Sequence, residues 1–365
     1  KRYAVRLGDP RNPSSYCVLN TEELKIELDE LVREAGVRPF LHARFADAVT
    51  EGGRINAAII EDKSGRHAVE AGFFIDASGD GDLAARAGFA LERRDNLQPP
   101  TACALIYGLD ALAAANPGFD LEKAVFDSKY EGALAEGFLW SSGHPQIPGL
   151  EMVAGTRVHG ADASDADSLT QAEIEGRRQV RAMMDVLREN FKGTRELSLV
   201  ALPAYIGVRE TRHPKCLYRV SEEDLLTGRP FEDAIAQGSY RVDIHYSNRA
   251  GLTFRYLDGR EEYVEPGKDK VTGRWRDPVE KDPTFYQVPY RSLVPEGSQN
   301  LLVAGRLADA DRGAYGACRV MVNCNQMGEA AGVAAARCVA EGAPIETAWR
   351  GLANETLPEM NYWHE

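Results

Sequence analysis

The stretch that decides the fold is NLLVAGRLADADRGAYGACRVMVNCNQMGEAAGVAAARCVAEG, which runs from Asn300 to Gly342. It opens with a continuous apolar run at residues 301–304 that stops at a glycine, and this is typical of a short buried strand with both faces covered. Alanines and glycines then crowd into residues 328–336, which predicts a helix that other groups can approach closely. We therefore expect a strand followed by a helix on the core of the protein.

The residues between this strand and this helix favour an anionic ligand. Arg306, Arg312 and Arg319 stand among three glycines there, so fixed positive charge is mixed with flexible backbone. A helix that begins near the end of a buried strand also directs unpaired N–H groups toward the same place. The alternative is that the small residues only allow tight packing of the helix.

A second stretch, residues 73–84, reads FFIDASGDGDLA and contains a G-x-G-x-x-A pattern after a predicted strand. This spacing matches the loop that binds a dinucleotide pyrophosphate. Asp80 and Asp82 would place two negative charges against that pyrophosphate, and the stretch follows a meander and does not open a β-α-β unit. We therefore interpret it as a strand and turn that pass beside a ligand.

Four motifs together resemble a known family: IDASGDGD at 75–82, AGR at 304–306, RVM at 319–321 and MGEAAGVAAA at 327–336. They resemble FAD-dependent oxidoreductases of the glutathione-reductase and succinate-dehydrogenase-flavoprotein type, most closely a bacterial branch. The resemblance implies FAD as the cofactor. Relatives carry an acidic residue where this chain has Arg306, and Asp309 or Asp311 would take that role. The implied cofactor-binding residues are Gly79, Asp80, Gly305, Arg306, Arg319, Asn323, Gly328 and Ala331.

The same resemblance implies the catalytic residues. The motif GVRETR at 207–212 implies that Arg209 and Arg212 bind a substrate carboxylate or sugar oxygens, oriented by Glu210. His245 ends a predicted strand and matches the family's DIH position, so it is the candidate acid or base. The alternatives are a surface ion-pair cluster and a structural histidine. The TRVHG stretch at 156–160 adds two possible cleft residues, Arg157 and His159.

Composition excludes several classes of protein. The 365 residues carry a formal net charge of −13, which argues against nucleic acid as a partner. No apolar run approaches the roughly 18 residues needed to span a bilayer, so we expect a cytoplasmic protein without membrane contact. The six cysteines include no C-x-x-C pair, and we expect no metal site. Cys324 lies at the expected helix start, but packing is its favoured role. A homo-oligomer remains possible.

Periodicity predicts several other elements. A helix is expected at 20–36 with its apolar residues on one face, followed by an antiparallel meander at 40–49, 54–61 and 67–74. A second helix is expected to start at a cap formed by Thr170, with Ile174, Met183 and Met184 on its buried face. Residues 253–264 predict a hairpin, and 265–282 a mobile surface loop.

The predicted fold is α/β, with a Rossmann-like FAD/NAD(P)-binding domain, incomplete at its N-terminus, and an inserted α+β substrate domain. The expected FAD-binding parts are residues 1–103 and 290–345, the substrate domain is 104–289, and 346–365 form a tail. We expect the native polypeptide to be longer, because nothing here offers a pyrophosphate-binding G-x-G-x-x-G loop. The expected reaction is hydride transfer between a small organic substrate and flavin. The alternatives are a non-catalytic binding subunit and a flavin-independent carbohydrate-active lyase.

Overall fold

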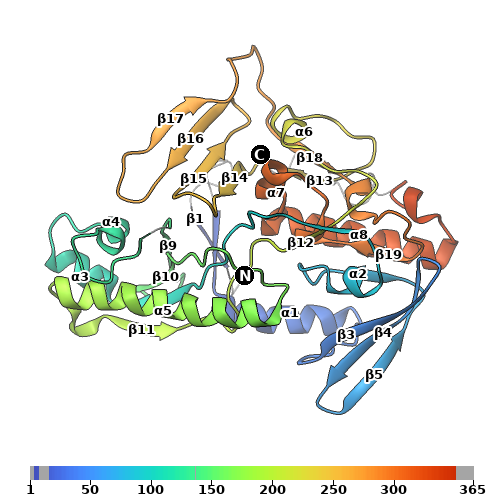
Figure 1. The fold of residues 1–365 in the computed structure, drawn as a ribbon, viewed down its shortest axis with the longest axis horizontal. Coiled ribbons are helices and arrows are strands. Elements are labelled where there is room, and N and C mark those ends of the chain that lie inside the picture. Colours follow the sequence, from blue (N-terminus) through green and yellow to red (C-terminus); the bar gives the residue numbers. More distant parts are fainter. Residues whose placement is uncertain (1–3, 8–15, 136, 351–365) are drawn as a thin grey trace.

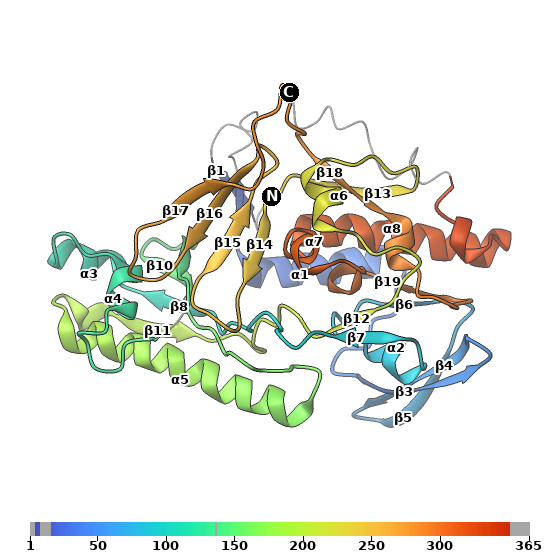
Figure 2. The same cartoon turned by 45° about the horizontal axis from the view of Figure 1, so that its top comes forward.

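The computed structural model describes residues 4–7, 16–135 and 137–350, and it is a mixed α/β protein (Figures 1 and 2). Its strands form small sheets. The two-stranded sheets pair β1 (Ala4–Leu7) with β2 (Tyr16–Leu19), β6 (Phe74–Asp76) with β19 (Leu301–Val303), β7 (Leu91–Arg93) with β12 (Arg212–Pro214), and β13 (Ala234–Gly238) with β18 (Tyr286–Pro289). The larger sheets have the strand orders β3 (Arg44–Glu51), β4 (Arg54–Asp62), β5 (Gly65–Glu70); then β11 (Ser198–Ala201), β8 (Ala104–Tyr107), β10 (Leu150–Ala154), β9 (Trp140–Gly143); and finally β14 (Val242–His245), β15 (Leu252–Arg255), β16 (Arg260–Val264), β17 (Val271–Arg274). The helices are α1 (Thr21–Glu34), α2 (Asp82–Arg86), α3 (Leu109–Ala115), α4 (Leu121–Phe126), α5 (Ala166–Asn190), α6 (Glu222–Leu226), α7 (Arg312–Cys318) and α8 (Met321–Glu341).

The buried strand predicted at 301–304 is confirmed. β19 is fully buried and pairs in parallel with β6, with Leu301 opposite Phe74. Because β6 and β19 are parallel, the residues that follow them meet at one edge. They include Gly79 and Asp80 after β6, and Gly305 and Arg306 after β19.

The predicted meander and the helix before it are also confirmed, as β3–β5 and α1. Asn20 caps α1 by accepting hydrogen bonds from the backbone N–H groups of Glu22 and Glu23. The apolar face of this helix is not buried among the described residues, because Leu28 is 50% exposed and Leu31 is 61% exposed.

The segment between β19 and α8 differs from the expected loop, because seven of its residues form the helix α7. Asp311 caps this helix by accepting a hydrogen bond from the backbone N–H of Ala314. A side chain at Gly316 would meet the backbone of Asp243 on β14, so the glycine allows α7 to lie directly against that strand. This close approach places β14 directly beside α7, the helix that precedes α8.

Three other expectations need correction. The helix expected from Thr170 is α5, which begins at Ala166 with Asp165 as its cap. Met183 and Met184 are buried in it as predicted, but Ile174 is 52% exposed. The expected hairpin at 253–264 is present as β15 and β16, and the expected mobile loop after it contains a further strand, β17, which extends the same sheet.

Two of the hydrophobic clusters enclose the region between the sheets. One packs α7 and α8 against β13, β14, β18 and β19, and the other packs α5 against β8 and β10. Figure 2 shows the sheet β14–β17 above the level of α5, with the chain between β7 and β8 running beneath β14. In the described part of the chain, no helix is both long and apolar enough to cross a membrane.

Candidate functional site

The edge after β6 and β19 brings together four of the predicted cofactor residues. Gly79 and Asp80 follow β6, and Gly305 and Arg306 follow β19. Arg306 Nη2 lies 3.3 Å from Asp80 Oδ1, and the guanidinium occupies the space where a side chain at Gly79 would project. Both glycines have positive φ, 79° and 68°, a conformation that other residues rarely adopt. Glycine is therefore required at each turn.

Arg212 also lies at this edge, away from Arg209. Its Nε donates a hydrogen bond of 2.8 Å to the carbonyl oxygen of Asp80, and its Nη2 pairs with the carboxylate of Asp82. Thr211 Oγ1 donates to Asp80 Oδ1 at 2.9 Å. These bonds fix the turn after β6, so a contact between Arg212 and substrate stays a prediction.

The first turn of α8 faces the same edge. Cys324 Sγ lies 3.8 Å from the position of a side chain at Gly305, and Val320, which precedes the helix, provides no side-chain cap. No acidic residue stands in this turn. Burial raises the pKa of the Cys324 thiol, and the thiol donates to the carbonyl of Arg319 at 3.3 Å, which agrees with a packing role. The uncapped N–H groups leave this helix end suited to an electron-rich group.

The other predicted cofactor residues lie in different surroundings. Asn323 is fully buried and donates to Tyr286 Oη at 2.9 Å and to the carbonyl of Ala317 at 3.0 Å, so it holds α8 to its neighbours. Ala331 belongs to the hydrophobic core, and Gly328 is exposed with no atom near it. Arg319 turns toward a different group of residues.

That group is an arginine cluster, which we define as Arg157, Arg209 and Arg319 around Asp243 and His245. The arginines come from the segment after β10, the segment before β12 and the junction of α7 with α8. Arg319 Nη2 lies 3.6 Å from Asp243 Oδ2, and His245 Nε2 lies 3.1 Å from Asp243 Oδ1. Arg319 thus lies beside the carboxylate of Asp243, which also interacts electrostatically with Arg157 and Arg209.

Arg157 and Arg209 are fixed by the chain between β7 and β8. Arg157 Nη1 donates to Thr101 Oγ1 at 2.9 Å, and Arg209 Nη1 donates to the same oxygen and to the carbonyl of Pro99, each at 2.6 Å. Arg157 is only 3% exposed. Arg209 is partly exposed as a residue, but the protein encloses its guanidinium. Both positive charges are thus held in place before any ligand binds.

The pKa values of the cluster reflect burial first and neighbouring positive charge second. Burial lowers the pKa of Arg157 to about 10, and burial together with Arg157 and Arg319 lowers the pKa of Arg209 well below its usual range. Burial alone would raise the pKa of Asp243, but His245, Arg319 and Arg209 hold it well below its ordinary value. Burial, aided by the charges of Arg209 and Arg157, lowers the pKa of His245 to about 3. His245 is therefore neutral at pH 7.

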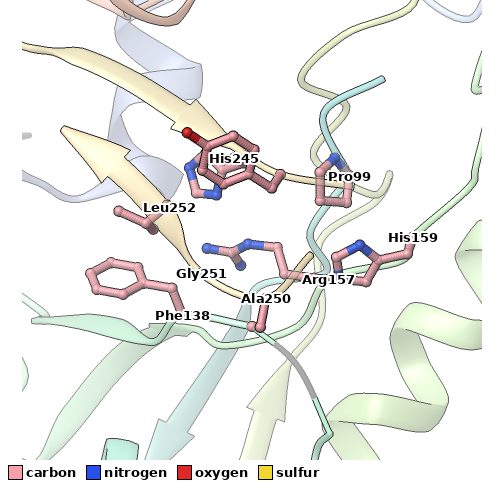
Figure 3. Close-up of a pocket in the computed structure, with 10 residues that line it drawn as sticks. Pro99, Phe138, Arg157, His159, His245, Ala250, Gly251 and Leu252 are labelled. Carbon is pink, nitrogen blue, oxygen red and sulfur yellow. The ribbon is translucent and has the colours of Figure 1, made fainter. Parts of the chain in front are cut away.

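Several donors of the cluster face no acceptor in the described part of the chain. They are Gln98 Nε2, Arg157 Nη2 and Arg319 Nε, all buried. Arg157 and His245 line a cavity whose other walls include Pro99, Phe138, His159 and Leu252, and the guanidinium of Arg157 reaches between His245 and Phe138 (Figure 3). The cavity has a volume of about 10 Å³, and one water molecule needs roughly 10–15 Å³, so the cavity is about the size of one water. Buried donors without partners fit a ligand that carries acceptor oxygens.

Lowering the pH should destabilise the protein through His245. In the unfolded chain its pKa is near 6.5, whereas in the folded protein it is about 3, so the unfolded state binds the proton first and stability falls between pH 6.5 and pH 3. At pH 5 this loss amounts to about 2 kcal/mol. Asp243 does not contribute above pH 5, because its folded-state pKa is lowered and its stabilising effect is lost only below about pH 4.

Urea unfolding at pH 7 and pH 5 measures this effect. The decrease in the free energy of unfolding from pH 7 to pH 5 should be about 2 kcal/mol smaller in His245→Asn than in the unaltered protein. The matched control is His42→Asn, because His42 is exposed and has a positive φ that asparagine tolerates. Equal pH dependence in the unaltered protein and His245→Asn would contradict a neutral buried His245.

Several residues of the cluster were not predicted from the sequence. Asp243 had a usable signal, since it lies two residues before His245 on one strand and must share its face. Gln98 and Thr101 lie in an irregular segment and carry no local pattern. No group of histidine, cysteine, aspartate and glutamate suited to a metal ion occurs among the described residues.

Comparisons with known proteins give the family. The chain is similar in structure to a triple mutant of the flavin-dependent brominase Bmp2, at 12% identity over 96% of this chain and 64% of that one, with a TM-score of 0.42. It is also similar to the myxobacterial chondrochloren halogenase CndH, at 10% identity over 99% and 64%, with a TM-score of 0.40. A geranylgeranyl bacteriochlorophyll reductase-like protein from Thermoplasma acidophilum matches at 12% identity over 99% and 69%, with a TM-score of 0.43.

The chain thus spans about two thirds or less of the length of the first two of these proteins. No curated protein sequence matches it significantly. The sequence of residues 2–350, by contrast, matches one family over nearly its whole length. The chain belongs to the FAD dependent oxidoreductase family.

Proposed function

We propose that this protein is an FAD-dependent oxidoreductase that transfers a hydride between a small anionic organic substrate and the flavin. The observation that carries the proposal is the arginine cluster, in which the charges of three guanidinium groups act on one carboxylate and two of these groups keep a donor without a partner. Such a site is unfavourable when empty and is compensated by a ligand of opposite charge. The flavin follows from the family, whose members depend on FAD.

The residues after β6 and β19 fit this cofactor. Gly305 has no side chain between its backbone and Cys324, Arg306 provides a fixed positive charge, and the first turn of α8 offers N–H groups without an opposing carboxylate. These three features would hold the electron-rich side of a flavin. When bound, FAD supplies the redox chemistry, and the protein supplies binding, orientation and electrostatics.

The chain's own residues then have distinct tasks. Arg157, Arg209 and Arg319 bind and orient the anionic group of the substrate. His245 accepts a proton from the substrate as it is oxidised, because its imidazole is neutral and enclosed. Asp243, at 3.1 Å from His245 Nε2, orients the ring and stabilises the imidazolium that forms. Substrate binding also reduces the excess positive charge, which makes His245 a stronger base.

Two measurements test this proposal. The purified protein, as isolated or after addition of FAD, should show the visible absorbance of bound flavin, and anaerobic addition of small organic acids should bleach it for at least one acid. A protein that takes up no FAD would instead favour a binding or assembly subunit. Turnover of an acid by flavin-free protein without an electron acceptor would favour the lyase alternative.

A further inference from the structure

The carboxamide of Gln98 contacts two members of the arginine cluster, Arg319 and His245. Its Oε1 accepts a hydrogen bond of 3.2 Å from Arg319 Nη2 and one of 3.5 Å from the backbone N–H of His245. Two donors converging on one atom fix the orientation of the amide, since an NH₂ group could not accept either bond. The NH₂ group must therefore lie on the other side of the amide.

This NH₂ group has no acceptor in the described part of the chain, although Gln98 is completely buried. A buried donor without a partner costs stability, and native proteins rarely keep one unless a ligand or water completes it. The two other unpartnered donors of the cluster belong to Arg157 and Arg319. Donors from three separate segments of the cluster thus lack an acceptor.

A rigid support holds Gln98 from behind. Its backbone N–H donates to Glu210 Oε2 at 2.9 Å, and Glu210 Oε1 accepts from Arg94 Nη1 at 2.7 Å and from His213 Nε2 at 2.9 Å. The edge of the His213 ring packs on Tyr315, with ring centroids 4.7 Å apart. Glu210 was expected to orient Arg209 and Arg212, but these bonds show that its carboxylate instead holds the segment that carries Gln98.

We propose that Gln98 Nε2 donates a hydrogen bond to an oxygen of the anionic substrate, and that Glu210 positions Gln98 for this contact. The proposal rests on the proposed function, because it requires the arginine cluster to bind an anion. Gln98 adds what the arginines lack, which is a neutral donor. It can contact an oxygen of the substrate without fixing the charge of that oxygen, so it suits a carboxylate, a carbonyl or an alkoxide equally well.

Two substitutions separate a direct contact from an effect of charge. Gln98→Glu keeps an oxygen that accepts from Arg319 and from the His245 N–H, but it loses the donor and adds a negative charge. Gln98→Met loses the donor without adding charge. Both should weaken binding of acetate, malonate or benzoate by roughly ten- to a hundredfold, the effect of a hydrogen bond to a charged group. Calorimetric titration at constant ionic strength measures the affinity.

The matched control is Gln171→Glu, which adds the same charge on the exposed surface of α5 and should leave the affinity unchanged. Thermal unfolding without ligand checks the fold. Gln98→Glu should be at least as stable as the unaltered protein, because its carboxylate lies among three guanidinium groups. A merely structural role for Gln98 predicts normal anion affinity in this variant.

The outcomes separate this inference from the proposed function. If the unaltered protein binds none of the three acids, the anion site itself is wrong, and the role of Gln98 falls with it. If the unaltered protein binds an acid and Gln98→Met binds it equally well, only the contact from Gln98 is overturned. Loss of affinity in Gln98→Glu alone would show repulsion between charges and would also overturn the contact. A change in the spectrum of bound flavin with unchanged anion affinity would assign Gln98 to the cofactor instead.

Discussion

Replacing His245 by alanine should slow the reduction of bound flavin by substrate roughly 10²- to 10⁴-fold, which is the usual contribution of a positioned acid or base. The imidazole is enclosed and its pKa is lowered to about 3, so it is neutral at pH 7 and has a ring nitrogen free to take up a proton during the reaction. Asp243 Oδ1 lies 3.1 Å from its Nε2 and stabilises the imidazolium. Anaerobic stopped-flow mixing of the oxidised protein with substrate measures the rate.

Flavin binding should survive this substitution, because the expected cofactor contacts lie after β6 and β19 and not on β14. The visible spectrum of the variant checks this point. His67→Ala is a suitable control, since His67 lies exposed on β5, a strand that Figure 1 shows well apart from β14. An unchanged rate of flavin reduction in His245→Ala would remove His245 from the mechanism and leave it a structural histidine.

The fold could be predicted where the pattern is local. The continuous apolar run at residues 301–304 favours a buried strand, and the turn signals at residues 52–53 and 62–65 between strand-like segments favour a meander, so β19 and β3–β5 were predicted. The helix α7 was missed, because Gly313 and Gly316 disfavour a helix by propensity. Tertiary contact reverses that preference, since only glycine lets α7 approach the backbone of Asp243.

The site could be predicted only in part, for a similar reason. Gly79 with Asp80 and Gly305 with Arg306 follow two paired strands, so two short motifs are enough to place them. The arginine cluster instead draws its members from separate parts of the chain, and no local pattern joins Arg157 to Arg319. The arginines of GVRETR were expected to bind substrate together, but Arg209 contacts Pro99 and Thr101, whereas Arg212 contacts Asp80 and Asp82.

Replacing Arg209 by lysine should lower kcat/KM by roughly 30- to 150-fold, which corresponds to a loss of about 2–3 kcal/mol for a charge-assisted hydrogen bond in an enclosed site. Arg209 Nη1 already binds Thr101 Oγ1 and the carbonyl of Pro99, and its planar fork leaves other N–H groups for the substrate. One ammonium group cannot serve both sides at once. The charge is retained in this variant, so any loss reports the geometry of the fork.

Steady-state kinetics then identify the step in which Arg209 takes part. A higher KM with unchanged kcat would mean that Arg209 binds the substrate and the transition state equally, whereas equal losses in kcat and kcat/KM would mean a contact made only in the transition state. Arg181→Lys is the matched control, because Arg181 pairs with Asp185 on the exposed surface of α5. Unaltered kinetics in Arg209→Lys would contradict a substrate contact and would leave the guanidinium only its bonds to Pro99 and Thr101. In that case Arg157 and Arg319 would have to bind the anion alone. Arg209 would then contribute only its charge, which lowers the pKa of His245 and so helps to keep the imidazole neutral.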